Sequence, residues 1–149
     1  MTRTAVDTNV LLDVFTADAT HGEPSKRALR HALTQGQLVV SSVVWAEVSA
    51  FFPSAGAAER ALSLIGLQYQ ELSATSASAA GQAWAAYRKR GGKRDPIIAD
   101  FLIGAHALRE ADCLLTRDRG FYRKYFVGLA VVDPSRTAPN QSPDPRQEP

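Results

Sequence analysis

Four acidic residues occupy positions where the sequence pattern alone would bring them together. They are Asp7, Glu47, Asp100 and Asp118. Asp7 ends the apolar run that begins at Thr4, and Asp118 follows the apolar pair Leu114 and Leu115 after two residues. In open α/β sheets, ligands bind in the crevice at the carboxyl ends of the strands. We therefore expect Asp7 and Asp118 to line one crevice.

Glu47 and Asp100 lie beside the apolar faces of two predicted helices. Glu47 comes three residues after Val44, and Asp100 is next to Phe101. A charge beside an apolar face is unfavourable unless it is paired or binds an ion. Each acid also has a simpler explanation. Glu47 could pair with an arginine at the rim of the core, Asp100 could interact with the helix dipole for ~0.3–1 kcal/mol, and Asp118 could cap a helix.

Converging carboxylates predict a site for a hard divalent cation. Mg²⁺ and Mn²⁺ prefer oxygen ligands, and Mg²⁺ keeps several of its waters. We expect Asp7, Asp100 and Asp118 to hold the metal and Glu47 to complete the catalytic set. Such a metal lowers the pKa of a bound water and stabilises charge in an in-line phosphoryl displacement. Three neighbouring side chains could support the ligands or the attacking water, although structural roles at strand ends are equally open: Thr8, Asn9 and Thr116.

Other kinds of catalytic site find no support in the sequence. The three histidines share no metal-ligand spacing with one another or with Cys113, which argues against zinc. No glycine-rich phosphate loop follows a predicted strand, and there is no nucleophile elbow. A phosphatase of the haloacid-dehalogenase type would want a second aspartate where Asn9 stands. A receiver-like signalling domain would need a lysine where Arg117 follows a late strand.

Several remaining polar residues are assigned structural roles. Asp95 stands directly before Pro96 and is expected to cap a helix. Asp13 and Asp112 are expected to be exposed charges in turns. His106 is expected to be a satisfied histidine of the core or surface. We therefore place none of them in the metal site.

An alternation of strand and helix patterns positions the acids. Strands are predicted near residues 4–7, 37–41, 68–72, 112–115 and 129–132, and the alternating polarity of 68–72 suits an edge strand. A helical pattern follows Asp7, and further helices are predicted over 23–35 with Ser25 as a cap, 43–52, 57–67, 76–90, 95–110 and 119–125. This order predicts an α/β fold, a three-layer α/β/α sandwich with a central, mainly parallel sheet of four to five strands.

The length of 149 residues indicates one domain. We predict that residues 1–133 form it and that the proline-rich, polar segment 134–149 is a disordered tail. The single cysteine, Cys113, lies in an apolar run and is expected to be a core thiol in a reducing compartment. No apolar run has the length of a membrane span or a signal peptide. These features favour a cytoplasmic protein with no membrane association.

Positive charge is concentrated in one part of the chain. Residues 88–124 carry ten Lys and Arg against five Asp and Glu, whereas residues 1–87 carry five against seven. This excess predicts a polyanionic partner. The basic residues directly before the Asp100 helix could bind phosphates, or could simply form a solvated helix end: Arg88, Lys89, Arg90, Lys93 and Arg94. Nearby aromatic residues could stack on bases, although most are expected in the core: Tyr87, Phe121, Tyr122 and Tyr125.

Four segments together resemble one protein family. They are residues 7–12 (DTNVLL), 45–48 (WAEV), 99–107 (ADFLIGAHA) and 115–121 (LTRDRGF). With these segments in order between residues 4 and 133, the chain resembles PIN-domain ribonucleases, and among them VapC toxins of toxin-antitoxin modules. By this resemblance Asp7, Glu47, Asp100 and Asp118 match the acids of the family, and Thr116 matches its hydroxyl residue.

The resemblance implies an activity and partners. It implies an endoribonuclease that uses Mg²⁺ or Mn²⁺ to cleave single-stranded or loop RNA, forms a homodimer and is held inactive by a small cognate antitoxin. Two alternatives stay open. The chain could be a PIN-fold RNA-processing nuclease without an antitoxin, or a non-catalytic module that binds RNA or protein.

Overall fold

The fold is built on a five-stranded sheet in which all neighbouring strands are parallel. The computed structural model describes residues 1–91 and 98–136. The strand order is β3-β2-β1-β4-β5, and the strands are β1 (Thr2–Val6), β2 (Gly36–Ser41), β3 (Leu67–Gln70), β4 (Cys113–Leu115) and β5 (Val131–Val132). The prediction of a parallel sheet is confirmed, and β3 is the predicted edge strand.

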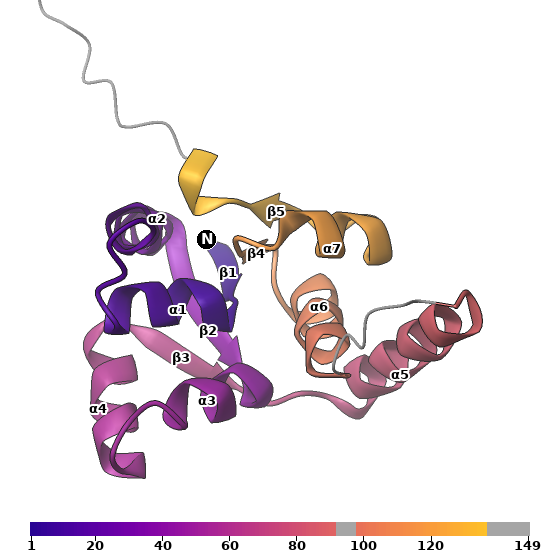
Figure 1. Ribbon diagram of the computed structural model, residues 1–149, viewed down its shortest axis with the longest axis horizontal. Helices are drawn as coiled ribbons and strands as arrows, with labels where there is room; N and C mark the ends of the chain where they lie inside the picture. The colour runs from indigo at the N-terminus through magenta and orange to yellow at the C-terminus, as the bar shows by residue number, and fades with distance from the viewer. Residues whose placement is uncertain (92–97, 137–149) are drawn as a thin grey trace, which may run out of the picture.

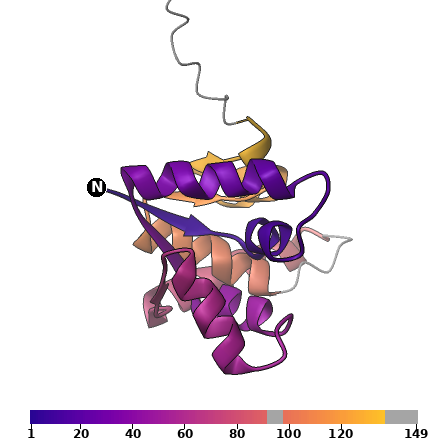
Figure 2. The same cartoon turned by 90° about the vertical axis from the view of Figure 1, so that its left-hand side faces the viewer.

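Helices cover both faces of this sheet. They are α1 (Thr8–Phe15), α2 (Gly22–Gln35), α3 (Ser42–Ser49), α4 (Ala55–Leu64), α5 (Ala74–Lys89), α6 (Ile98–Glu110) and α7 (Arg119–Tyr125). Helices α1 to α4 lie on one side of the sheet and α5 to α7 on the other (Figure 1). The view turned by 90° shows α2 running alongside β1 (Figure 2). The predicted three-layer α/β/α sandwich is therefore confirmed.

Serine side chains begin three of the helices. The hydroxyl of Ser41 accepts a hydrogen bond from the backbone of Val44 in α3, and Ser54 and Ser73 do the same for α4 and α5. Such caps satisfy backbone N–H groups that have no partner within the helix. The prediction that Ser25 caps α2 is wrong, because α2 begins at Gly22 and Ser25 is fully buried inside it. Asp95 lies outside the described residues.

The core forms where the strands pack beneath the helices. Leu38 and Val40 of β2 and Leu114 and Leu115 of β4 are almost completely buried, as expected for central strands. At the junction of α2 and β2, Gly36 pairs with Thr2 of β1. A Cβ atom at Gly36 would collide with the Thr2 backbone, so the close approach of these strands requires glycine.

The end of the described chain differs from the predicted tail. Residues Pro134–Arg136 form a 3₁₀ turn, η1, that packs near α2, and Pro134 is buried. The first three residues of the predicted tail are thus part of the described structure. Residues 137–149, on which the rest of that prediction falls, lie outside the described part. Within the described ranges, no helix combines the length and apolar character needed to cross a membrane.

The sheet topology fixes where a ligand would bind. From β1 the chain proceeds to β2 and β3 on one side, and then to β4 and β5 on the other. The order therefore reverses between β1 and β4, and open α/β sheets bind ligands at the carboxyl ends of the strands at such a point. Asp7 follows β1 and Thr116 follows β4.

Candidate metal centre

Asp7 is the most buried acid of the predicted site, with 6% of its surface exposed. It is the N-cap of α1 and accepts a hydrogen bond of 2.7 Å from the backbone N–H of Thr8. Its other oxygen, Oδ2, accepts one of 2.8 Å from the hydroxyl of Thr116 and a longer one of 3.4 Å from the amide of Asn9. These donors fix the orientation of the carboxylate.

Burial raises the pKa of Asp7 from 3.8 to about 6. The hydrogen bonds from Thr116, Thr8 and Tyr122 lower this pKa, but they do not offset the loss of water, and the negative charge of Asp100 raises it further. The ionised carboxylate is therefore unfavourable in the protein alone. A bound cation would remove this cost.

Tyr122 of α7 lies near acids from three different segments of the chain. The residue is 1% exposed, and its pKa lies above the usual range because it is buried and because Asp7, Asp100 and Asp118 all place negative charge near its hydroxyl. All three acids therefore lie near enough to this phenol to act on its charge. The sequence analysis did not identify Tyr122 as a site residue. Its aromatic character predicted only a core position or base stacking.

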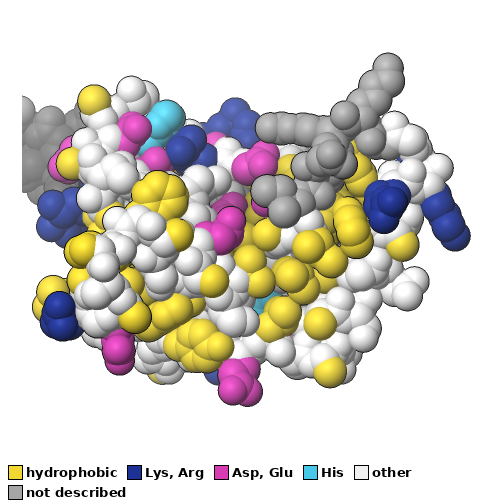
Figure 3. All heavy atoms as spheres, turned by 60° about the horizontal axis from the view of Figure 1, so that its bottom comes forward, with side chains coloured by type: hydrophobic (Ala, Val, Ile, Leu, Met, Phe, Trp, Pro, Cys, Tyr) yellow, Lys and Arg dark blue, Asp and Glu magenta, His cyan; other side chains and the backbone are white. Residues whose placement is uncertain are grey.

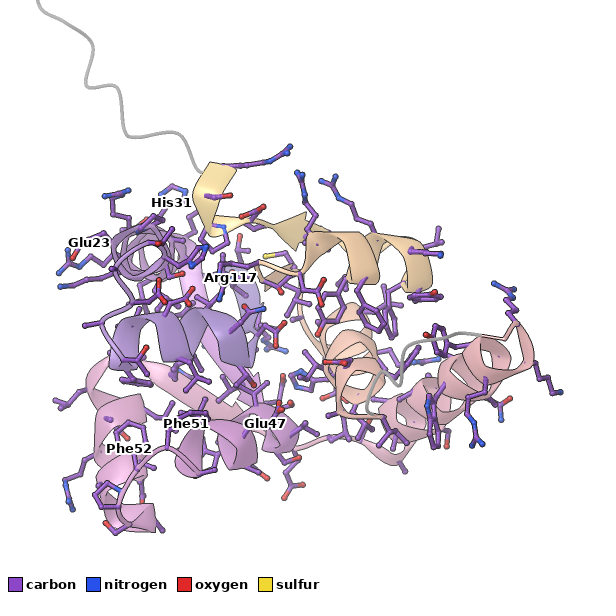
Figure 4. The ribbon with its side chains drawn as sticks, in the orientation of Figure 1. Glu23, His31, Glu47, Phe51, Phe52 and Arg117 are labelled. Atoms are coloured by element: carbon purple, nitrogen blue, oxygen red, sulfur yellow. The ribbon has the colours of Figure 1, made fainter. Side chains whose placement is uncertain are left out.

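Glu47 enters the site from α3. Its Oε1 atom accepts a hydrogen bond of 2.8 Å from the hydroxyl of Thr8, the residue that follows Asp7. Figure 4 shows the side chain of Glu47 directed into the space between α3 and α6. The alternative of an ion pair at the rim of the core finds no support, because among the described residues no Lys or Arg pairs with Glu47.

Asp118 is the exposed member of the set. It occupies the N-cap position of α7, but its side chain makes no capping hydrogen bond. Its backbone N–H donates to the hydroxyl of Thr116 at 3.0 Å, and the amide of Asn9 contacts the same hydroxyl at 3.4 Å. The carboxylate of Asp118 is therefore left available to a ligand, while Thr116 links its backbone to Asp7.

Asp13 was predicted to be an exposed turn charge, and this prediction is wrong. Asp13 is 3% exposed and receives two hydrogen bonds from the guanidinium of Arg117, at 2.8 and 2.9 Å. The hydroxyl of Ser25 donates a third at 2.8 Å. Figure 4 shows Arg117 lying close to α1 and α2. Because Arg117 stands between Thr116 and Asp118, this ion pair anchors the loop that carries both site residues.

A second group of metal-ligand side chains lies beside this ion pair. Ligand atoms of Asp13, Asp18 and His21 lie within 4.8 Å of one another, and among the described residues they are the only group of three or more His, Cys, Asp or Glu side chains that do so. However, both oxygens of Asp13 already bind Arg117, and Asp18 contacts the His21 ring at 3.2 Å. These groups satisfy one another. Asp7, by contrast, accepts its hydrogen bonds from the neutral groups of Thr8, Thr116 and Asn9.

The charge balance of the predicted site fits a divalent cation. Within the described ranges, no Lys or Arg forms an ion pair with Asp7, Glu47 or Asp118. The donors are all oxygen atoms, the type that Mg²⁺ and Mn²⁺ prefer. Figure 3 shows acidic side chains in the middle of one face of the molecule, with hydrophobic side chains on both sides. A metal would supply the missing positive charge.

Comparison with known proteins agrees with the fold and the topology. The family model "PIN domain" matches residues 4–127. The chain belongs to the PIN-domain family. No curated protein matches it by sequence.

Solved structures share the fold of this PIN domain at low sequence identity. A chain of VapBC2 from Rickettsia felis, bound to a DNA fragment from its promoter, is 19% identical with a TM-score of 0.67, covering 88% of this chain and 98% of its own. A chain of VapBC-1 from nontypeable Haemophilus influenzae is 17% identical (TM-score 0.67, coverage 90% and 99%). VapC20 of Mycobacterium tuberculosis, a Sarcin-Ricin loop cleaving toxin, is 18% identical (TM-score 0.57, coverage 85% and 98%).

The predicted basic run of the PIN domain lies only partly within the described residues. Arg88 and Lys89 end α5, and Arg90 is its C-cap, whereas Lys93 and Arg94 fall outside. The guanidinium of Arg88 lies 5.0 Å from the centre of the Trp84 ring. Since α5 packs along α6, whose first turn holds Asp100, a role of this run in RNA binding stays a prediction.

Two other predictions concern residues outside the metal centre. The aromatic residues near α7 form a packed cluster with Phe101, in which Tyr87 is buried and Phe121 and Tyr125 are half-buried. His106 is buried, but its Nε2 atom has no hydrogen-bond partner among the described residues and lies 3.7 Å from Glu110. The expectation of a satisfied histidine is therefore wrong. Burial lowers the pKa of His106, and the charge of Glu110 opposes this effect.

Proposed function

We propose that this PIN domain is a metal-dependent endoribonuclease and the toxin of a type II toxin-antitoxin pair. One observation carries the proposal: Asp7 is buried with hydrogen bonds that lower its pKa less than burial raises it, and Asp7, Asp100 and Asp118 all lie near enough to the Tyr122 hydroxyl to raise its pKa. A bound cation would offset the cost of burying the Asp7 charge. Membership of the PIN family and the fold shared with VapC proteins indicate a nuclease. The substrate class, RNA, rests on the activity of such neighbours.

The residues of the site have separable roles in this proposal. Asp7, Asp100 and Asp118 would hold Mg²⁺ or Mn²⁺, which when bound neutralises phosphate oxygens and lowers the pKa of a water. The Thr116 hydroxyl donates a hydrogen bond to Oδ2 of Asp7 and so fixes the orientation of this carboxylate. Thr8 occupies Oε1 of Glu47, which leaves Oε2 to accept a hydrogen bond from the attacking water or from a metal-bound one.

A cleavage assay with matched variants tests the nuclease. Labelled single-stranded RNA is incubated with the protein and Mg²⁺ or Mn²⁺, with and without EDTA. We expect cleavage only with metal, and a loss of at least about 100-fold in Asp7→Asn and in Asp100→Asn, each of which removes a ligand charge and almost no volume. Glu59→Gln, at an exposed position of α4, is the control for loss of one negative charge. Circular dichroism checks folding.

Three outcomes would contradict the proposal. Cleavage that persists in EDTA would exclude a metal-dependent reaction. A variant of Asp7 or Asp100 that cleaves within tenfold of wild type would remove that residue from the metal site. A folded wild-type protein that binds RNA without cutting it, with either metal, would instead favour the non-catalytic module.

We also propose two protein partners, a cognate antitoxin and a second copy of the chain. The structural neighbours include VapBC complexes, which supports the antitoxin. Large apolar side chains remain exposed at Phe51 (63%) in the loop after α3, at Leu64 (87%) in α4 and at Tyr69 (51%) in β3, and such surface favours protein contacts. Co-expression with the product of the adjacent reading frame should yield a complex without RNA cleavage. Size measurement of the isolated chain should give a dimer.

A bacterial or archaeal cytoplasm fits the single unpaired thiol of Cys113.

A further inference from the structure

A small hollow next to the metal centre is lined by three arginines. It has a volume of about 230 Å³ and lies between α7, β5 and η1. Arg119 and Arg123 come from α7 and Arg136 comes from η1. Strand β5 supplies Val131 and Val132. We call it the arginine hollow. It is separate from the basic run at the end of α5.

The positive charge of the arginine hollow is largely uncompensated. Its one acid, Asp133, accepts hydrogen bonds of 2.9 and 2.7 Å from the backbone and hydroxyl of Ser135, and lies 3.9 Å from Arg119. Arg123 and Arg136 are exposed, and neither forms an ion pair with a carboxylate of the described residues. Three arginines against one aspartate leave a formal excess of two positive charges.

The hollow adjoins the acids through one short helix. Arg119 directly follows Asp118, and Arg123 comes one turn later on the same side of α7, about 6 Å along the helix axis. Tyr122, whose hydroxyl faces the acids, precedes Arg123 by one residue. Successive helix residues are about 100° apart around the axis. Around the axis of α7, the direction of Tyr122 therefore differs by roughly 80° from the mean direction of Arg119 and Arg123. A strand lying across α7 would therefore pass from the acids into the hollow.

The chemistry of the hollow selects phosphate as the ligand. Guanidinium groups bind phosphate oxygens with two parallel hydrogen bonds, and the charge is permanent. The acids nearby repel a polyanion, so a substrate strand needs positive charge outside the metal centre. We infer that the arginine hollow binds a backbone phosphate of the RNA substrate next to the cleaved bond. This inference rests on the proposed function, because it assigns a further contact to the same substrate.

Salt-dependent RNA binding tests the arginine hollow. The double variant Arg123→Ser/Arg136→Ser is compared with wild type and with Arg60→Ser/Arg109→Ser, which loses the same charge at exposed positions on α4 and α6. Binding of a labelled single-stranded RNA is measured in EDTA, where no cleavage occurs, over a range of salt. Each lost phosphate contact lowers the slope of log K against log salt by ~0.7, so loss of the one phosphate in the hollow should decrease the slope by about 0.7 and weaken binding roughly fivefold at 0.1 M salt.

The outcomes distinguish this inference from the proposed function. Failure of wild type to bind or cleave RNA would contradict the proposed function itself. If wild type binds and cleaves, but the Arg123/Arg136 variant keeps the wild-type slope and affinity, the arginine hollow is not a phosphate site. An equal decrease in the Arg60/Arg109 control would also overturn the inference, because the effect would then report net charge alone. Unchanged circular dichroism of both variants is required for each comparison.

Discussion

The ion pair between Asp13 and Arg117 gives the sharpest test of how the fold holds the site. The side chain of Asp13 is 4% exposed and that of Arg117 is 32% exposed. Arg117→Met and Asp13→Asn, made separately and together, form a double-mutant cycle across this pair. Both substitutions keep most of the side-chain volume, so they change mainly charge and hydrogen bonding.

The unequal burial of the two partners predicts unequal costs. Removing Arg117 leaves the fully buried Asp13 carboxylate without its partner, which costs ~3–5 kcal/mol. Removing the charge of Asp13 leaves a guanidinium that water still reaches, so the cost is smaller, about 1–2 kcal/mol. The double variant has no stranded charge and should be about 2–3 kcal/mol more stable than the sum of the single effects predicts, which is the size expected for partners in contact.

Urea unfolding followed by circular dichroism measures these differences. For Arg117→Met, thermal unfolding should shift downward by roughly 10 °C, since 1 kcal/mol corresponds to about 2–4 °C for a domain of this size. RNA cleavage should also fall in the folded fraction, because Arg117 anchors the loop between Thr116 and Asp118. Additive single effects, or a larger cost for Asp13→Asn than for Arg117→Met, would refute the argument from burial.

Three further predictions follow from the same structure. The folded-state pKa of Asp7 is raised to about 6, so its burial favours the fold below pH 4 and costs stability as the pH rises through 6. In EDTA, the stability of Asp7→Asn relative to wild type should therefore increase from pH 4 to pH 7 by up to about 3 kcal/mol. A pH-independent difference would contradict this prediction. Asp100→Asn should likewise melt at a higher temperature than wild type in EDTA at pH 7. Added Mn²⁺ should raise the melting temperature of wild type more than that of Asp100→Asn. If Asp100→Asn melts lower than wild type in EDTA and Mn²⁺ affects both equally, Asp100 is not part of the metal centre. Gly104→Ala should destabilise the protein by about 1–3 kcal/mol, because its Cβ would collide with the Phe126 ring. Gly81→Ala, with open space around it in α5, should instead stabilise the protein by up to about 1 kcal/mol. Equal urea midpoints of the two variants would contradict the packing argument.

The positions of Asp7 and Thr116 could be predicted because the sheet is parallel. Carboxyl ends of parallel strands meet at one edge, and apolar runs followed by polar residues locate those ends. The partner of Asp13 could not be predicted, because no local pattern connects it with Arg117, 104 residues later. A signal was nevertheless present. Asp13 follows the buried Val10 by three residues, the same spacing that marked Glu47 after Val44 as a charge needing a partner.

The helix ends show the same limit of local information. The helices α4 and α5 begin at Ala55 and Ala74, two residues earlier than predicted, and their serine caps are Ser54 and Ser73. Ser25 fits the pattern of a cap equally well, yet Asp13 accepts its hydroxyl inside the fold. Tyr122 illustrates the converse. Its ring belongs to the aromatic core that the sequence predicts, while the direction of its hydroxyl depends on how α7 packs against three other segments.

The two sets of buried acids differ in how their charge is compensated, and this difference separates structure from function. The protein itself neutralises Asp13 with Arg117, whose two hydrogen bonds would be lost if a metal took the carboxylate. Among the described residues, the donors to Asp7 are the neutral groups of Thr8, Thr116, Asn9 and Tyr122, and Asp100 adds a further negative charge nearby. Neutral donors orient a carboxylate without cancelling its charge, so its burial stays costly in the protein alone. A site that is oriented but not neutralised favours a cation from outside the chain, and the stability gained from Mn²⁺ should therefore depend on Asp7 and not on Asp13.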